Sequence, residues 1–246
     1  MTITIKSCGI SDIGLVRTNN EDVFAELLEQ KCFILADGMG GHQAGEIASH
    51  EAVKILSHLL QKNGKFLQNS LEEALKVIHN AICEVNTHVY KLSRSSLELK
   101  GMGTTICLVH IHNEGIIIAH VGDSRIYRLR SSELSLLTKD HSLLRELMDL
   151  GQIKEDHASG YHYKNIITRA IGTEAVVEPT LQIEMVQKND IFILCSDGLS
   201  DLLTIKEIEA VINEADSLSL AATRLILLSK KRGGHDNITL ILVQII

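Results

Sequence analysis

Aromatic residues are nearly missing from this sequence: they make up 3% of the chain, and tryptophan is absent. Hydrophobic residues as a whole nevertheless reach 45%, which is enough for a sizeable core. Large rings therefore cannot fill most of the interior. We expect a core built mainly from isoleucine, leucine, valine and alanine.

Proline is almost as scarce, since Pro179 is its only occurrence, and no stretch rich in glycine and serine interrupts the chain. Linkers between domains are usually rich in such residues. No internal repeat is visible in the 246 residues either. We therefore expect residues 1–246 to form a single domain.

Cysteines are few and odd in number: five occur, at positions 8, 32, 83, 107 and 195. No pair has the spacing of a metal site, and Cys32, Cys107 and Cys195 lie within apolar runs. This pattern is typical of buried free thiols rather than of disulfides or zinc ligands. Free thiols persist in reducing compartments, so we expect a cytoplasmic protein.

Basic patches and long apolar runs are lacking too. The formal net charge is −7, and the basic run Lys230-Lys231-Arg232 is typical of a helix C-terminus. Nucleic-acid-binding proteins usually present a basic face, and a membrane span needs about 18 consecutive apolar residues. The N-terminus also lacks the apolar segment of a signal peptide. We expect a monomer that binds neither nucleic acid nor membrane.

What the sequence does contain is a series of short apolar runs rich in β-branched residues. His112-Asn113-Glu114-Gly115 separates two of them and predicts a hairpin turn. Successive strands with short connections favour antiparallel sheets. The runs that we predict as strands are 31–36, 104–111, 115–121, 125–130, 165–170, 181–186, 190–195 and 238–246.

Apolar residues at helical spacing occur in four further segments, which are 46–60, 71–92, 205–214 and 217–231. Ser70 with Glu73, and Thr204 with Glu207, have the spacing of capping boxes. One pair of helices precedes most strands and the other precedes the last strand. The sequence therefore predicts an α+β fold, a central sandwich of two antiparallel β-sheets flanked by pairs of α-helices.

Aspartates recur at the ends of the predicted strands. Asp37 follows 31–36, Asp123 lies just beyond 115–121, Asp197 just beyond 190–195, and Asp236 just ahead of 238–246. A single Asp-Gly pair is most simply explained as a turn. Four aspartates at the margins of hydrophobic strands favour a shared site, because strands hold ligands precisely.

Clustered carboxylates repel one another unless a cation neutralises them. Oxygen ligands without a cysteine or histidine pattern favour Mn²⁺ or Mg²⁺ over zinc. Two such ions about 3.5–4 Å apart can share a carboxylate and activate a water as nucleophile at neutral pH. That chemistry suits attack on phosphorus.

The residues around these aspartates add two further hints. The glycines of Asp37-Gly38-Met39-Gly40-Gly41 let the backbone approach closely, so that a carbonyl can become a ligand. Arg17, five residues before Asp22, could grip a phosphate with two hydrogen bonds, although a solvated arginine is the commoner case.

Taken together, eight stretches of the chain resemble the protein phosphatase 2C family of metal-dependent protein phosphatases, in its compact bacterial form. They occur in the family's order from about residue 9 to residue 246: GLVRTNNEDVF, ADGMGGHQAGEIAS, GMGTT, AHVGDSRIYRLR, LTKDHSLL, NIITRAIG, CSDGLSD and GGHDNITLILV. The resemblance implies a serine/threonine phosphatase that hydrolyses phosphoserine and phosphothreonine esters on substrates of a serine/threonine kinase. It also implies a metal site between the two sheets.

The resemblance implies a set of metal ligands, residue by residue. Asp37 would bridge two Mn²⁺ or Mg²⁺ ions, and the Gly38 carbonyl would bind one of them. Asp197 and Asp236 would bind the other ion. Asp22 would act as a ligand directly or through water.

Other positions match the family's supporting residues. Asp123 matches the position of a weaker third ion, and Arg17 matches the arginine that grips the phosphate. Asn237 is expected to orient the preceding aspartate. Eukaryotic members carry a histidine, proposed as general acid, where this chain has Met39. His42 or a metal-bound water could replace it, and His42 could equally be a plain loop residue.

Residues 140–164 are polar and mixed, with a first part that looks helical and amphipathic. By resemblance they form a flap beside the active site, an interpretation compatible with a connecting loop. Two rival functions remain open. One is a catalytically inactive family member that acts as a phosphoprotein-binding regulator, although such proteins usually lose metal ligands. The other is a nuclease-like phosphohydrolase, against which the charge of −7 argues.

Overall fold

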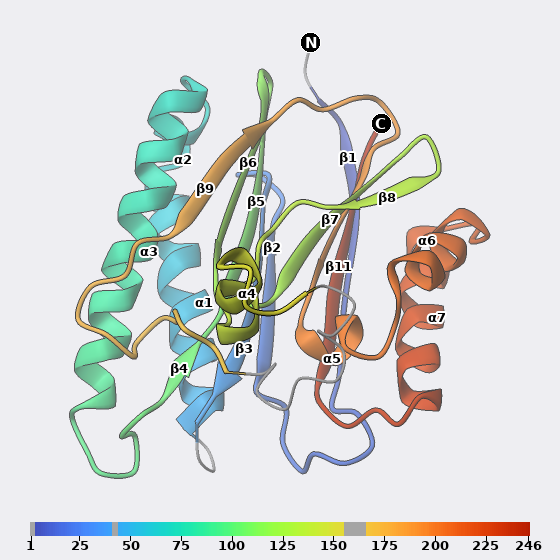
Figure 1. Ribbon diagram of the computed structural model, residues 1–246. Coiled ribbons are helices and arrows are strands. Elements are labelled where there is room, and N and C mark those ends of the chain that lie inside the picture. The colour runs from blue at the N-terminus through green and yellow to red at the C-terminus, as the bar shows by residue number, and fades with distance from the viewer. Residues whose placement is uncertain (1–2, 41–43, 155–165) are drawn as a thin grey trace.

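The computed structural model describes residues 3–40, 44–154 and 166–246. The elements form four layers, in which two antiparallel sheets are stacked between two layers of helices (Figure 1). The α+β sandwich predicted from the sequence is therefore confirmed.

One sheet has six strands in the order β2-β3-β5-β6-β9, with β4 paired to β3. Every neighbouring pair is antiparallel. The strands are β2 (Asp22–Leu27), β3 (Cys32–Met39), β4 (Gly103–Thr104), β5 (Ile106–His112), β6 (Gly115–Val121) and β9 (Thr180–Glu184).

The other sheet has five strands in the order β1-β11-β10-β7-β8. Strand β1 pairs with β11 in continuous register from Ile5↔Ile245 to Asp12↔Ile238, so the first and last strands lie side by side. The strands are β1 (Ile5–Asp12), β7 (Arg125–Arg130), β8 (Glu133–Leu136), β10 (Ile191–Cys195) and β11 (Ile238–Ile245).

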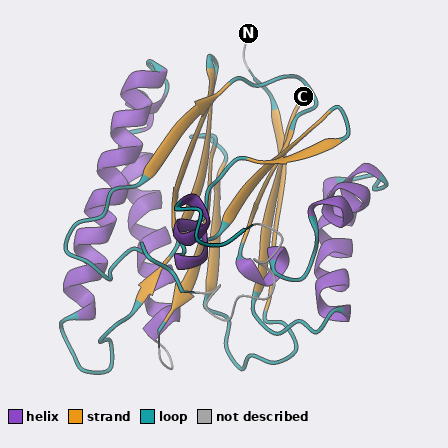
Figure 2. Cartoon of the chain, in the orientation of Figure 1, coloured by secondary structure: helices purple, strands orange, loops and turns teal. Residues whose placement is uncertain are grey.

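Helices cover the outer face of each sheet, as the purple layers of Figure 2 show. Within the described residues, no helix combines the length and apolar character that crossing a membrane requires. The helices are α1 (Ala44–Lys62), α2 (Gly64–Leu67) and α3 (Leu71–Ser93) on the six-stranded sheet, α5 (Asp197–Ser200), α6 (Ile205–Asn213) and α7 (Leu218–Lys231) on the five-stranded sheet, and the short α4 (Leu143–Asp149).

Strand β3 shows how sequence alternation builds these layers. Cys32, Ile34 and Ala36 pack in the cluster beneath α1 and α3, whereas Phe33 and Leu35 pack between the two sheets. Successive side chains of a strand point to opposite faces, so an unbroken apolar run can fill two cores at once. All five residues are fully buried.

Several predicted elements differ from the observed ones. The predicted strand 165–170 is wrong over its described part, where Ile167 makes only an isolated bridge to Ser142. Strands β1, β2 and β8 escaped prediction because they mix polar and apolar residues without a long apolar run. The capping box at Thr204 and Glu207 is complete. At α3 the Glu73 carboxylate instead accepts a hydrogen bond from Asn69.

A buried asparagine on α3 fastens the segment that precedes β9. Asn86 is 1% exposed. Its Oδ1 accepts from the Gly172 N–H at 2.8 Å, and its Nδ2 donates to the Glu174 carbonyl at 3.0 Å. Buried backbone groups need such partners, so this one side chain satisfies the buried Gly172 N–H and also holds the Glu174 carbonyl.

We expect Asn86→Ala to lower the free energy of unfolding by about 2 kcal/mol, because the Gly172 N–H and the Glu174 carbonyl lose their partner. Asn80, exposed on the same helix, offers a matched control, and Asn80→Ala should change the stability by less than about 0.5 kcal/mol. Urea denaturation measures both. Equal losses in the two variants would contradict this fastening role.

Candidate metal centre

The ends of strands from both sheets place acidic residues around one cavity. Asp22 and Asp37 are direct cross-strand neighbours on β2 and β3. Asp197 begins α5 just after β10, and Asp236 lies just ahead of β11. The cavity measures about 340 Å³ and is lined by Arg17, Glu21, Asp37, Gly38, Met39, Gly40, Asp123, Ile167, Asp197, Asp236 and Asn237.

Most of the predicted site residues therefore come together. Arg17, Asp37, Gly38, Asp123, Asp197 and Asp236 all line the cavity. Asp22 lies behind this lining and is 6% exposed, with the Ser196 hydroxyl donating to its Oδ2 at 2.8 Å. His42 falls in the 41–43 gap and lies outside the described residues, as does the flap from 155 to 164.

The backbone of Asp37 is held firmly in place. Its N–H donates to the Thr105 hydroxyl at 2.9 Å, and its carbonyl accepts from the Thr104 hydroxyl at 2.8 Å and the Thr105 N–H at 2.9 Å. A side chain that serves in a site must keep its position. The threonines of the GMGTT stretch provide that rigidity.

Gly38 sits where three backbone segments converge. A Cβ at this position would meet the Gly45 carbonyl at the start of α1 and lie 2.7 Å from the Glu21 carbonyl. The Gly38 N–H itself donates to the Glu21 carbonyl at 3.1 Å. Only glycine fits here, which agrees with the close backbone approach expected from the sequence.

Burial and mutual repulsion shift the titration of these aspartates. Burial raises the pKa of Asp197 to about 8 and the pKa of Asp22 to about 6. The pKa of Asp37 is raised well above its ordinary value, first by burial and then by Asp22, Asp197 and Asp123. Ionised carboxylates crowded in this way require a compensating cation.

Arg17 stands at the rim of the cavity. Its side chain is 48% exposed and donates to Asp236 Oδ2 at 2.7 Å. This hydrogen bond raises the pKa of Arg17 above its ordinary value. An exposed guanidinium that already faces the aspartates is well placed to receive an incoming phosphate.

Asn237 has a wider role than the sequence indicated. Its backbone N–H donates to Asp236 Oδ1 at 2.8 Å, so the backbone, not the side chain, orients that aspartate. The side chain holds the loop between β1 and β2. Its Nδ2 donates to the carbonyls of Ile13 and Asn19, and its Oδ1 accepts from the Glu21 N–H at 2.8 Å.

Two functional residues were missed by reasoning from the sequence. Glu21 lines the cavity, and its carbonyl accepts from Gly38 and from the Ser49 hydroxyl. Ser196 joins the two sheets, because its hydroxyl donates to Asp22 and accepts from the Thr239 N–H at 3.1 Å. Their only sequence signal is adjacency to Asp22 and Asp197.

A smaller cavity of about 70 Å³ adjoins the first, and Asp123 and Asp197 line both. Burial and the neighbouring Asp140 raise the pKa of Asp123 to about 6. The Arg125 guanidinium donates to both oxygens of Asp140. The lining residues are Asp123, Arg125, Asp140, Ser142, Leu144, Asp197, Ser200 and Asp201.

The donor set fits hydrated divalent cations. Among the described residues, no three acidic, histidine or cysteine side chains already stand close enough to hold one ion between them. Mg²⁺ commonly keeps several waters and binds through one or two carboxylates. The possible ligands here are carboxylates that raise one another's pKa and a backbone carbonyl. Such oxygen ligands suit Mn²⁺ or Mg²⁺ better than a metal whose ligands all come from the protein.

Comparisons with known proteins agree with this geometry. The sequence pattern described as Protein phosphatase 2C matches residues 16–237. The serine/threonine phosphatase stp of Listeria welshimeri is 39% identical over 95% of this chain and 93% of that protein. The structure of the S. agalactiae serine/threonine phosphatase has a TM-score of 0.92 at 39% identity, covering 99% of this chain and 100% of that one.

A further solved structure bears on the metals. The catalytic domain of the serine/threonine phosphatase PstP, in complex with two manganese ions, has a TM-score of 0.87 at 33% identity and covers 100% of both chains. A family pattern over most of the chain agrees with relatives that align along nearly its whole length and share its fold. This chain therefore belongs to the protein phosphatase 2C family.

Proposed function

We propose that this chain is a metal-dependent protein serine/threonine phosphatase that removes phosphate from phosphoserine and phosphothreonine residues of proteins. One observation carries the proposal: aspartates from separate strands of both sheets line a single cavity together with an arginine. The named relatives are serine/threonine phosphatases, which supports the same reaction.

Two Mn²⁺ or Mg²⁺ ions, when bound, would supply an activated water and neutralise charge on the phosphate. Asp37 and the Gly38 carbonyl would hold one of them. Asp197 and Asp236 would hold the other together with Asp37, and Asp22 would support the site from behind. Manganese is favoured as the first choice by the PstP structure with two manganese ions.

The chain's own residues perform the rest of the work. Arg17 would position the phosphate by donating to its oxygens, since its guanidinium is exposed at the rim. Asn237 keeps the Arg17 loop in place through the carbonyls of Ile13 and Asn19. Holding the phosphate and the aspartates in a fixed geometry lowers the entropic part of the barrier.

We assign Asp123 to a weaker third ion, as the second cavity beside it supports. The leaving serine or threonine oxygen needs a proton. Met39 lines the cavity but cannot supply one. A cation next to Asp123 would acidify water at that point. His42 remains the other proposed donor.

An inactive, phosphoprotein-binding role has less support. All five aspartates expected as ligands are present, and four of them line the cavity while Asp22 lies directly behind it. Nothing in the arrangement or in the names of the relatives favours loss of catalysis.

The remaining proposals concern the setting of the enzyme. We propose a single catalytic domain over residues 1–246, because β1 and β11 complete one sheet from the two ends of the chain. Free thiols at Cys32, Cys107 and Cys195 support a reducing, cytoplasmic location. We further propose a monomer that reverses the action of a serine/threonine kinase, with residues 140–164 as a flap that influences substrate choice.

Activity on para-nitrophenyl phosphate should depend on added Mn²⁺ or Mg²⁺, because a cluster of oxygen ligands binds such ions reversibly. Excess EDTA should abolish turnover, and excess Mn²⁺ should restore it. The comparison of Mn²⁺ with Mg²⁺ titrations shows which ion the site prefers. Full turnover in excess EDTA would remove the basis for the metal mechanism.

Asp37→Asn and Asp197→Asn should each reduce kcat by more than about 100-fold. Replacing even a residue that only hydrogen-bonds to a metal ligand commonly lowers activity by up to about 100-fold. In EDTA, both variants should melt at the same temperature as the unmodified protein or higher, because one repelling charge has gone. Asp216→Asn, at an exposed loop position, is the matched control and should change neither quantity. Near-normal turnover in either site variant would refute its assignment as a ligand.

Asp123→Ala should slow a phosphothreonine peptide more than para-nitrophenyl phosphate, whose leaving group needs less protonation. Calorimetry should still show two ions bound with little change in affinity. If Asp123 merely stabilises the turn after β6, the variant would lose thermal stability and slow both substrates equally. That pattern would exclude the third-ion role.

A further inference from the structure

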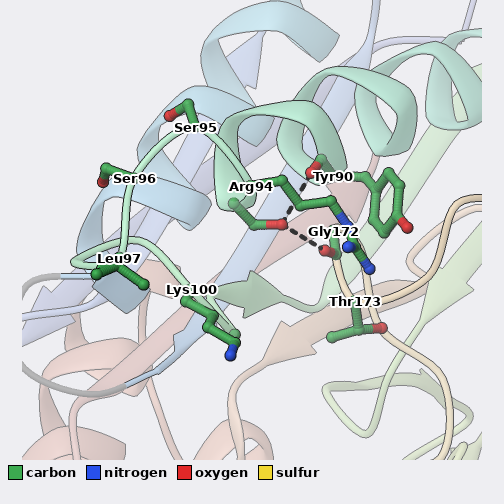
Figure 3. A pocket seen from close by; sticks show the side chains of 10 residues that line it. Tyr90, Arg94, Ser95, Ser96, Leu97, Lys100, Gly172 and Thr173 are labelled. Carbon is green, nitrogen blue, oxygen red and sulfur yellow. Dashed lines mark hydrogen bonds between the residues drawn. The ribbon is translucent and has the colours of Figure 1, made fainter.

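A larger cavity, of about 590 Å³, opens at the C-terminal end of α3 (Figure 3). It lies outside the metal centre, with which it shares no lining residue. Residues of the α3 end, the following loop and a segment before β9 surround it. They are Tyr90, Ser93, Arg94, Ser95, Ser96, Leu97, Lys100, Gly101, Gly172 and Thr173.

The charge of this cavity is opposite to that of the whole chain. Arg94 and Lys100 line it and no lining residue is acidic, although the chain has a net charge of −7. Within the part of the chain that the structure describes, neither cation forms an ion pair with a carboxylate. Many other cations of the protein do, including Arg17, Arg125 and Arg130.

The cations stand on a firm support. The Arg94 guanidinium lies 4.7 Å from the centre of the Tyr90 ring, and Figure 3 shows the two side by side. This cation–π contact restricts the arginine without neutralising it. Beneath them the Ser93 hydroxyl donates to the Tyr90 carbonyl at 2.8 Å and the Gly172 carbonyl at 3.3 Å, which joins α3 to the segment before β9.

The cavity comes near the metal centre at a single glycine. A Cβ at Gly103 would lie 2.8 Å from the Met39 side chain and 2.9 Å from the Thr173 side chain. Met39 lines the metal cavity and Thr173 lines the cationic one. Lining side chains of the two cavities therefore lie close together, on either side of the buried Gly103.

We propose that this cavity binds acidic side chains that flank the phosphorylated residue of a protein substrate. The inference rests on the proposed phosphatase function, because it makes the cavity a specificity subsite for that reaction. Carboxylates or a second phosphate would pair with Arg94 and Lys100, and the half-buried Tyr90 and the exposed Leu97 would contact the apolar parts of the peptide. A cationic subsite would offset, at this position, the repulsion that a chain of net charge −7 exerts on acidic segments.

The test reverses both charges in Arg94→Glu/Lys100→Glu and measures kcat/KM on three substrates. Two are phosphothreonine peptides of equal length, with glutamates or glutamines on both sides of the phosphothreonine, and the third is para-nitrophenyl phosphate. The unmodified enzyme should prefer the glutamate peptide. The variant should lose about fivefold or more on it, as two weakened charge pairs imply, and should keep its rates on the other two substrates.

Two further variants separate local from general effects. Arg224→Glu/Lys231→Glu makes the same charge change at exposed positions of α7, on the other helical layer, and should leave the preference intact. Arg94→Lys/Lys100→Arg keeps the charge and should retain it too. An unmodified enzyme without preference, or an equal loss in the α7 variant, would overturn the subsite. If the unmodified enzyme has no activity on any of the three substrates, the phosphatase function itself is contradicted.

Discussion

The structure depends above all on holding several aspartates close together in a buried place, where their carboxylates repel one another. Asp22, Asp37 and Asp197 lie at strand ends where water is largely excluded, and their pKa values are raised first by burial and then by the charges of neighbouring aspartates. An arrangement that costs stability in this way persists only where the surrounding structure enforces it. The enforcement comes from hydrogen bonds to Thr104, Thr105, Ser196 and Asn237. The bond of Ser196 links the two sheets, and that of Asn237 links two loops.

The layered fold explains how so much charge can be held in one place. Each sheet is anchored to its own helices by a separate apolar core, and a third core joins the sheets. The edge where the sheets meet is therefore not needed for apolar packing. Strands that are rigid along their length can present polar ends there without weakening the interior. The phosphatase site and the cationic cavity both lie at ends of elements, namely of β3 for the first and of α3 for the second.

Long apolar runs and motif spacing predicted much of this architecture. Strands β6 and β7 begin and end where the sequence indicated, and Asp37, Asp123, Asp197 and Asp236 reach the cavity as expected. Strands β1 and β2 were not found, because their residues are only partly buried and lack a clear period. The roles of Ser196 and Asn237 arise from contacts between residues 174 and 216 positions apart. Arg94 follows Tyr90 by four residues, a helical spacing that brings their side chains together, but no local signal places Gly172 beside them.

The pairing of β1 with β11 has a consequence for how the protein is made. Asp236 and Asn237 immediately precede the last strand, and that strand is held between β1 and β10. During synthesis from the N-terminus, β1 lacks this partner until more than 220 further residues have been made and β11 has left the ribosome. Contacts so distant in sequence form late. The nascent chain therefore cannot assemble a complete metal centre, or begin catalysis, before β11 has emerged.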